Sequence, residues 1–146
     1  MSSYPSELGH VHLKVRDLDR SIAFYTDVLG LGVAERVGSY AFLTFGDHHH
    51  DLALQSVTDG AGHPGPGVGL YHSAWEVDTP VALRDTHERL RARDVPVAPV
   101  DHGISKALYF DDPDGNGVEV YLDTREARGR EAWDGENERF EPAELS

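Results

Sequence analysis

The chain repeats its own plan after 62 residues, and this repeat limits the available folds more than any other feature. The segment from His10 and the segment from His72 each read as a short alternating strand, a helix cap, a helix and further strands. The offset places His10 on His72, Val15 on Val77 and Val28 on Leu90. Residue identity is sparse, but the shared order predicts two copies of a β-α-β-β-β unit.

The first copy begins with a strand in which Val11, Leu13 and Val15 alternate with polar residues. The helix that follows is capped by Asp17 or Asp19 and ends at Gly30. We predict a strand at 9–16, a helix at 18–29 and strands at 33–37, 40–45 and 51–57.

The second copy follows the segment 59–69, which is dense in Gly and Pro and reads as a linker. Thr79 is a suitable helix N-cap, and Pro80 is tolerated at the first helical position. We predict a strand at 71–77, a helix at 80–93 and strands at 95–100, 106–110 and 117–122.

A chain of 146 residues predicts one α+β domain. Each half is too small to be stable comfortably alone, so we expect the halves to share one core. The predicted parts are module one at about 7–58, the linker at 59–69, module two at about 70–123 and a charged tail at 124–146. We expect the tail to be solvated, with Trp133 and Phe140 available to pack on the body or on a second subunit.

The composition excludes several classes of partner and site. A formal net charge of -13 disfavours nucleic acid and anionic lipid, which bind basic surfaces. The absence of cysteine rules out disulfides, zinc–thiolate sites and iron–sulfur clusters. No long apolar run predicts a membrane span, and the start of the chain lacks a signal-peptide pattern, so we expect a cytoplasmic protein.

Nine histidines stand out in this cysteine-free chain, because imidazole and carboxylate are then the remaining strong transition-metal ligands. Strand alternation places His10, His72 and Glu119 on the faces turned away from the helices. If the two sheets curve together, these side chains converge as two imidazoles and one carboxylate, the facial triad that suits Fe(II) or Mn(II). Ordinary half-exposed strand residues explain the same pattern, so spacing alone leaves both interpretations open.

The sequence resembles the vicinal oxygen chelate superfamily, which includes glyoxalases, bleomycin-resistance proteins and type I extradiol dioxygenases. The resemblance covers about residues 8–123, and it rests on the motifs GHVHLKVRDLDRSIAFYTDVLGL, HHHDLALQ, YHSAWEVD and LYFDDPDGNGVEVY. It implies two tandem βαβββ modules that form a cup-shaped mixed sheet around a metal site.

Within the superfamily the chain looks most like extradiol catechol dioxygenases. That resemblance implies that His10, His72 and Glu119 are the metal ligands. It also implies that His50, which precedes Asp51-Leu52-Ala53-Leu54, is the acid–base residue, assisted by His102 and Tyr109. Simple alternation from an inward Ala53 turns His50 outward, so either a bulge near His50 or an inward His49 is expected.

The resemblance implies an Fe(II)-dependent enzyme, with Mn(II) or another divalent metal as substitute. Such an enzyme opens a catechol ring beside its two hydroxyls, using a small aromatic substrate and O2. A homodimer or higher homo-oligomer is expected from the superfamily. The alternatives are a glyoxalase-like isomerase or lyase, a thiol transferase, and a non-catalytic drug-binding protein. Ala53 stands where glyoxalase I has a fourth ligand, which argues against a glyoxalase.

The same residues also have non-catalytic interpretations. The run His48–His50 fits a polar turn, and His102, between Asp101 and Gly103, fits a plain turn residue. Tyr109 fits a core aromatic with its hydroxyl at the rim.

Overall fold

The computed structural model describes residues 2–146 and divides them into two compact units. The first unit ends at His63 and the second begins at Pro64, so the boundary lies within the segment predicted as a linker. No helix among the described residues is both long and apolar enough to cross a membrane.

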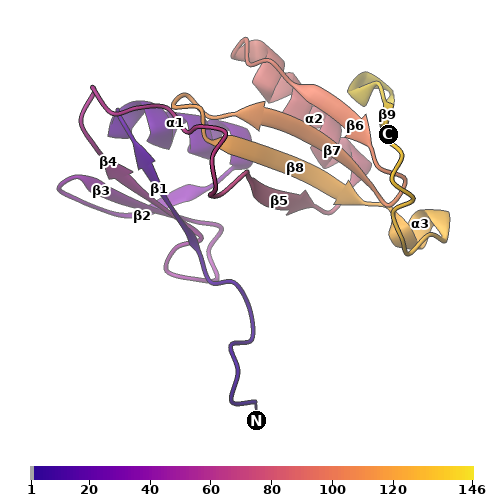
Figure 1. Ribbon diagram of the computed structural model, residues 1–146, viewed down its shortest axis with the longest axis horizontal. Helices are drawn as coiled ribbons and strands as arrows, with labels where there is room; N and C mark the ends of the chain where they lie inside the picture. Colours follow the sequence, from indigo (N-terminus) through magenta and orange to yellow (C-terminus); the bar gives the residue numbers. More distant parts are fainter. Residues whose placement is uncertain (1) are drawn as a thin grey trace. The chain divides into compact units, whose positions relative to one another are not determined.

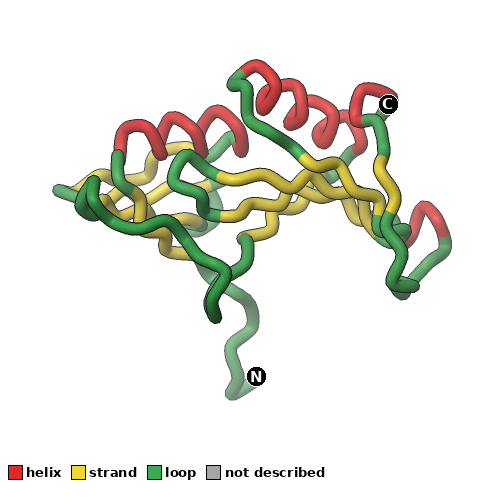
Figure 2. Tube along the Cα trace, turned by 45° about the horizontal axis from the view of Figure 1, so that its top comes forward, coloured by secondary structure: helices red, strands yellow, loops and turns green. Residues whose placement is uncertain are grey.

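The first unit is a four-stranded mixed sheet with one helix. Its strands lie in the order β1-β4-β3-β2, where β1 and β4 are parallel and the other pairs are antiparallel. Helix α1 lies along one face of this sheet (Figure 1, Figure 2). The elements are β1 (Val11–Val15), α1 (Leu18–Leu29), β2 (Gly32–Val37), β3 (Tyr40–Thr44) and β4 (Leu52–Ser56).

Helix α1 begins and ends at the predicted residues because both of its ends carry local signals. The Asp17 side chain accepts a hydrogen bond from the Arg20 backbone N–H, and Gly30 adopts the left-handed conformation that ends a helix. Phe24, Tyr25 and Val28 are buried on one stripe of the helix, which joins it to the sheet.

The second unit is a five-stranded mixed sheet in the order β5-β8-β7-β6-β9, again with its first strand parallel to a distant one. Helix α2 is capped by Thr79 and buries Leu83 and Leu90. The elements are β5 (Ser73–Val77), α2 (Pro80–Ala92), β6 (Ala98–Asp101), β7 (Ser105–Asp111), β8 (Gly117–Asp123), α3 (Arg125–Arg128), β9 (Glu138–Arg139) and the 3-10 helix η1 (Pro142–Glu144).

The parallel pairs β1–β4 and β5–β8 occupy the same place in the two units. The prediction of an α+β fold from two β-α-β-β-β modules is therefore confirmed. The core of the second sheet consists of alternate residues that face α2, among them Val118 and Val120.

Most residues of the tail are exposed, and parts of it also pack on the second sheet. Strand β9 pairs with β6, joining Val100 to Arg139 and Asp101 to Glu138. Beyond it, the Leu145 carbonyl accepts a hydrogen bond from Arg84 on α2 over 3.2 Å. These contacts could not be predicted from the sequence, because two-residue strands and short 3-10 turns have no periodicity to detect.

Candidate functional site

His72 and Glu119 form a close pair in the second unit. His72 stands one residue before β5, and Glu119 lies in β8, where it is the ladder partner of Ala74. The Nε2 atom of His72 is 2.9 Å from Oε2 of Glu119, and the Glu119 side chain is only 12% exposed. The parallel pairing of β5 with β8 therefore joins two residues that are far apart in the sequence.

Gly117 permits this approach at the start of β8. A Cβ atom at Gly117 would lie 2.3 Å from the Tyr71 carbonyl oxygen and 3.3 Å from the His72 Cβ. The preceding turn is held by Asp112, whose carboxylate accepts hydrogen bonds from the backbone N–H groups of Asp114 and Asn116. The predicted turn thus also sets how closely the His72 backbone packs against β8.

Tyr109 and His102 extend the pair into a chain of hydrogen bonds. Tyr109 is the ladder partner of Glu119, and its hydroxyl donates to Oε1 of Glu119 over 3.1 Å. Nε2 of His102 is 2.7 Å from the same hydroxyl. Burial raises the pKa of the Tyr109 hydroxyl, and the nearby Glu119 carboxylate raises that pKa further.

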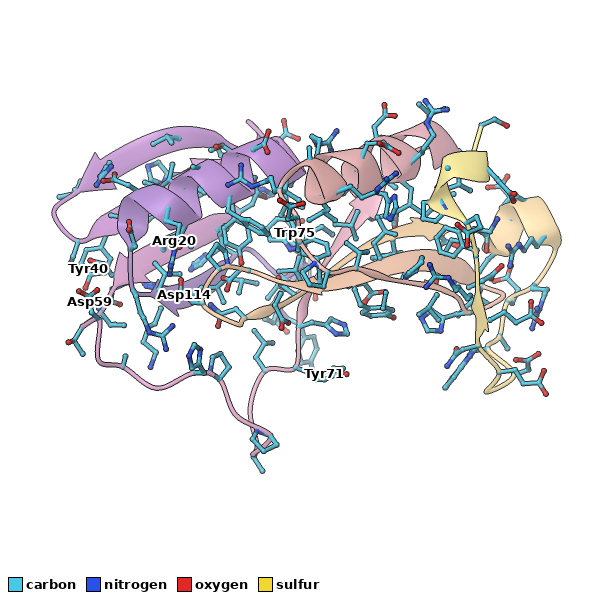
Figure 3. All side chains as sticks on the ribbon, turned by 90° about the horizontal axis from the view of Figure 1, so that it is seen from above. Arg20, Tyr40, Asp59, Tyr71, Trp75 and Asp114 are labelled. Carbon is cyan, nitrogen blue, oxygen red and sulfur yellow. The ribbon has the colours of Figure 1, made fainter. Side chains whose placement is uncertain are left out.

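A pocket of about 410 Å³ opens beside this chain. Its polar groups are His72, Tyr109 and Asp111, and its apolar wall includes Phe110 and Val118. Tyr71, which also lines the pocket, projects from the side of the second sheet opposite α2 (Figure 3). Mixed walls of this kind and a volume of a few hundred Å³ are typical of small-molecule sites.

The donor chemistry of the pair fits a divalent metal. An imidazole nitrogen and a carboxylate oxygen 2.9 Å apart are close enough to bind one ion. The other ring nitrogen of His72, Nδ1, is buried and has no hydrogen-bond partner within residues 2–146. The same is true of Nδ1 of His87 on α2, so the fit of this pair to a metal rests on the approach of Nε2 to Oε2.

The first unit holds the remaining histidines of the predicted site. His10 stands one residue before β1, and its ring centroid is 4.3 Å from that of His50. The Val11 N–H donates to the Asp51 carbonyl over 3.1 Å, which holds the two segments together. Burial lowers the pKa of His50, and the neighbouring His10 and His49 lower that pKa further.

His50, and not His49, is the residue beside His10. The His49 side chain is 58% exposed, and its Nε2 lies 3.2 Å from a carboxylate oxygen of Glu35. Strand β4 begins only at Leu52, so His50 stands outside the ladder, where side-chain alternation does not apply. The conflict between an inward Ala53 and an inward His50 arises only if the strand includes both residues.

The six predicted site residues thus lie in two groups. His10 and His50 belong to the first unit, and His72, His102, Tyr109 and Glu119 belong to the second. Within residues 2–146, no three His, Asp or Glu side chains are grouped as a complete metal site. The three-ligand set remains a prediction, of which the second unit contributes a close pair.

Sequence reasoning missed the C-terminal residues that contact His102. The Asn137 side-chain oxygen is 2.5 Å from Nδ1 of His102, and Arg128 binds the adjacent Asp101. No motif links positions so far apart, and only the aromatic residues Trp133 and Phe140 indicated that the tail could pack on the body.

Comparison with known proteins identifies a family. The sequence model of the Glyoxalase/Bleomycin resistance protein/Dioxygenase superfamily matches residues 7–120. A crystal structure of a glyoxylase/bleomycin resistance protein/dioxygenase domain from Frankia sp. EAN1pec superimposes with a TM-score of 0.72 and 25% identity. That match covers 82% of this chain and 99% of the other.

Three curated relatives show the range of the family around this chain. Biphenyl-2,3-diol 1,2-dioxygenase 3 of Rhodococcus globerulus is 37% identical over 125 residues, which cover 80% of this chain and 63% of that protein. Manganese-dependent 2,3-dihydroxybiphenyl 1,2-dioxygenase of Geobacillus genomosp. 3 is 29% identical over 137 residues, covering 90% and 41%. Lactoylglutathione lyase of Salmonella typhimurium is 32% identical over 124 residues, covering 77% and 90%. The chain therefore spans less than two thirds of either dioxygenase.

Proposed function

Because the chain belongs to the glyoxalase, bleomycin resistance protein and dioxygenase superfamily, we propose that it is a divalent-metal-dependent extradiol dioxygenase. Its substrates would be O2 and a small catechol-type aromatic diol, whose ring opens beside the two hydroxyls. The observation that carries the proposal is the hydrogen-bonded chain His102–Tyr109–Glu119–His72 at the edge of the pocket. The similarity to ring-cleaving dioxygenases supports the choice of reaction.

The proposed metal ligands are His72 and Glu119 from the second unit and His10 from the first. Two imidazoles and one carboxylate suit Fe(II), and Mn(II) or another divalent ion is the substitute. When bound, such an ion would act as a Lewis acid that favours loss of a proton from a substrate hydroxyl. Ala53 is buried in β4 and would offer a bound ion no fourth donor.

The protein's own residues handle protons and orientation in this proposal. His50 takes up a proton from the substrate and returns one to the product, which is the usual task of an imidazole in catalysis. Tyr109 holds a substrate oxygen by a hydrogen bond, and His102 orients the Tyr109 hydroxyl through its Nε2 atom. The pocket beside Tyr109 receives the ring itself.

The decisive experiment is oxygen uptake by the full-length protein. The protein is loaded anaerobically with Fe(II) or Mn(II), its metal content is measured, and it is then mixed with air-saturated buffer and a panel of catechols. We expect uptake together with a yellow ring-opened product. His72→Ala and Glu119→Ala should lower uptake by at least about 100-fold. His63→Ala, in the exposed segment between the sheets, is the matched histidine control.

The contribution of His10 is tested separately, because it lies in the other unit. His10→Ala should lower metal affinity by about 10- to 100-fold without unfolding either unit. Metal-loaded wild-type protein that consumes no O2 with any catechol would contradict the dioxygenase proposal. Wild-type metal affinity in His10→Ala would remove His10 from the ligand set.

One observation favours a second function. The match to a lactoylglutathione lyase covers 90% of that protein, whereas the dioxygenase match covers 63% of the longer relative. The competing reaction is the isomerisation of a glutathione hemithioacetal at the same metal. The same metal-loaded protein is therefore assayed with such a hemithioacetal, and turnover there without oxygen uptake would replace our proposal.

A further inference from the structure

We infer that the C-terminal segment, residues 124–139, is a positioning element for His102. The segment contacts the turn that carries His102, and Asn137 requires a hydrogen on the Nδ1 atom of the His102 ring. The catalytic meaning of this arrangement rests on the function proposed above. The hydrogen position itself does not, and it can be measured in a protein with no activity.

The first contact is made on the residue before His102. Arg128 donates to both carboxylate oxygens of Asp101, each over 2.8 Å, and to the Gly103 carbonyl over 3.0 Å. Both side chains are mostly buried, with 30% of Arg128 and 18% of Asp101 exposed. A bidentate guanidinium–carboxylate pair fixes the relative orientation of the two side chains as well as the distance between them. Arg128 therefore anchors the turn on both sides of His102.

The second contact is made with Gly103, the residue after His102. Gly103 is buried with a φ of +79°, and the Arg130 guanidinium lies against its backbone, 2.4 Å from where a Cβ would stand. That guanidinium is itself held by Asp134 over 2.9 Å. Strand β9 adds ladder pairing to Val100 and Asp101. The C-terminal segment thus contacts the turn on both sides of His102.

The third contact is to the ring itself. Oδ1 of Asn137 is 2.5 Å from Nδ1 of His102, and the Trp133 ring stands edge-on to the imidazole with centroids 6.3 Å apart. Trp133 is oriented by its own hydrogen bond to the Glu136 carbonyl. An amide oxygen only accepts hydrogen bonds, so this contact requires a hydrogen on Nδ1.

The chemical consequence concerns the opposite ring nitrogen. With Nδ1 committed to Asn137, His102 exchanges a proton only at Nε2, which lies 2.7 Å from the Tyr109 hydroxyl. When that hydroxyl donates to Glu119, Nε2 must carry a hydrogen. When the Tyr109 hydroxyl instead donates to Nε2, that nitrogen must carry no hydrogen. Asn137 thus confines proton exchange by His102 to the side that faces Tyr109 and Glu119.

The test reads the position of the hydrogen directly. Long-range ¹H–¹⁵N spectra of the full-length protein report which nitrogen of each imidazole is protonated, and His102→Gln identifies the signals of His102. We expect a protonated Nδ1 in wild type and in Asn137→Asp, whose side-chain oxygen also accepts. Asn137→Leu, which removes the acceptor, should lose that state. Glu131→Gln, at an 82% exposed side chain in the same segment, is the control.

An unprotonated Nδ1 in wild type, or an unchanged Nδ1 in Asn137→Leu, would overturn the inference. If Asn137→Leu does not fold, the nearly isosteric Asn137→Asp decides: a wild-type tautomer supports the inference, and a changed one contradicts it. Oxygen uptake gives a second readout, with kcat/KM about tenfold lower in Asn137→Leu and near wild type in Asn137→Asp. If no variant consumes O2 while the tautomer responds as expected, the dioxygenase proposal fails and the positioning role of the segment stands.

Discussion

Glu119 uses its two carboxylate oxygens for different partners. Oε2 faces the His72 imidazole, and Oε1 accepts the Tyr109 hydroxyl. A glutamate in mid-strand is usually a solvated surface residue, whereas this side chain is largely buried and fully engaged. A carboxylate bound on both sides is held in one orientation, which is the condition for a dependable metal ligand.

Gly117 is the residue whose replacement tests the packing beneath this pair. Gly117→Ala places a methyl group 2.3 Å from the Tyr71 carbonyl, a backbone atom that cannot turn away. We expect the free energy of unfolding, measured by urea denaturation, to fall by about 1–3 kcal/mol. Gly65→Ala is the control, because a Cβ there meets nothing within 4 Å. Equal stability of the two variants would show that β5 and β8 have room to separate.

The sequence indicated the site residues that lie on regularly alternating strands, and it missed those whose contacts depend on irregular segments. Alternation and the repeat picked out His72 and Glu119, and the structure places them 2.9 Å apart. Alternation could not choose between His49 and His50, because both precede the strand to which the rule applies. Asn137 carried no signal at all, since its contact with His102 joins a turn to the tail.

At the level of elements, helix ends were more predictable than strand ends. Helix α1 runs from Leu18 to Leu29, as expected, because capping depends on a few neighbouring residues. Strand β6 begins at Ala98, later than the expected 95, because a strand end is set by where its partner begins and ends. Helix caps can be predicted from a few neighbouring residues of one sequence, whereas the exact ends of paired strands cannot.

The N-cap of α2 provides a direct test of that local chemistry. The Thr79 hydroxyl accepts a hydrogen bond from the Ala82 backbone N–H over 3.1 Å. Thr79→Ala should lower the free energy of unfolding by about 1 kcal/mol, and Thr79→Ser, which keeps the hydroxyl, should retain most of it. Both are measured by urea denaturation at neutral pH. Equal losses in the two variants would locate the effect in the threonine methyl group and not in the cap.

The Asp101–Arg128 pair should make the stability of the second unit depend on pH. The hydrogen bond from Arg128 holds the pKa of the Asp101 carboxyl below its usual value of about 3.8. A carboxyl with a lowered folded-state pKa adds stability above about pH 4, and that stability is lost as pH falls through the folded-state pKa. Asp101→Asn should therefore lower the free energy of unfolding at pH 7 by about 1–2 kcal/mol.

The difference between Asp101→Asn and wild type should shrink as the pH is lowered from about 4 toward 2, where the wild-type carboxyl becomes neutral as well. Urea titrations at pH 7, 4 and 3 measure it. If the difference in free energy of unfolding stays constant over this pH range, the effect comes from the shape of the side chain and not from its charge.

The molecule consists of two units with the same order of elements, as the 62-residue repeat in the sequence predicted. The first strand of each unit lies parallel to its last long strand, and a helix covers one face of each sheet (Figure 1). Every strand pair joins residues of the same unit. The repeat predicted two copies of one element order, and the structure adds which strands pair within each copy.

Residues 62–71 between the two sheets are exposed throughout, and they include the large apolar side chains of Leu70 and Tyr71. Brief digestion with chymotrypsin should therefore make its first internal cut after one of these two residues, giving two large fragments identified by mass spectrometry. Replacing both with serine should slow that cut. A dominant early cut after Phe45 or Trp133, which are also exposed, would show that another segment opens more readily.

The parallel pairing within each unit also sets an order of folding events. The antiparallel neighbours β2–β3 and β7–β8 are close in sequence and close only short loops. Strands β5 and β8 are separated in the sequence by the helix and two further strands, so we expect their contact to be the slow, non-local step. We expect His72 and Glu119 to come together at the end of folding. Capture of a metal ion by this pair would then mark a finished second unit, and a nascent chain still lacking β8 would offer the ion one imidazole without its carboxylate.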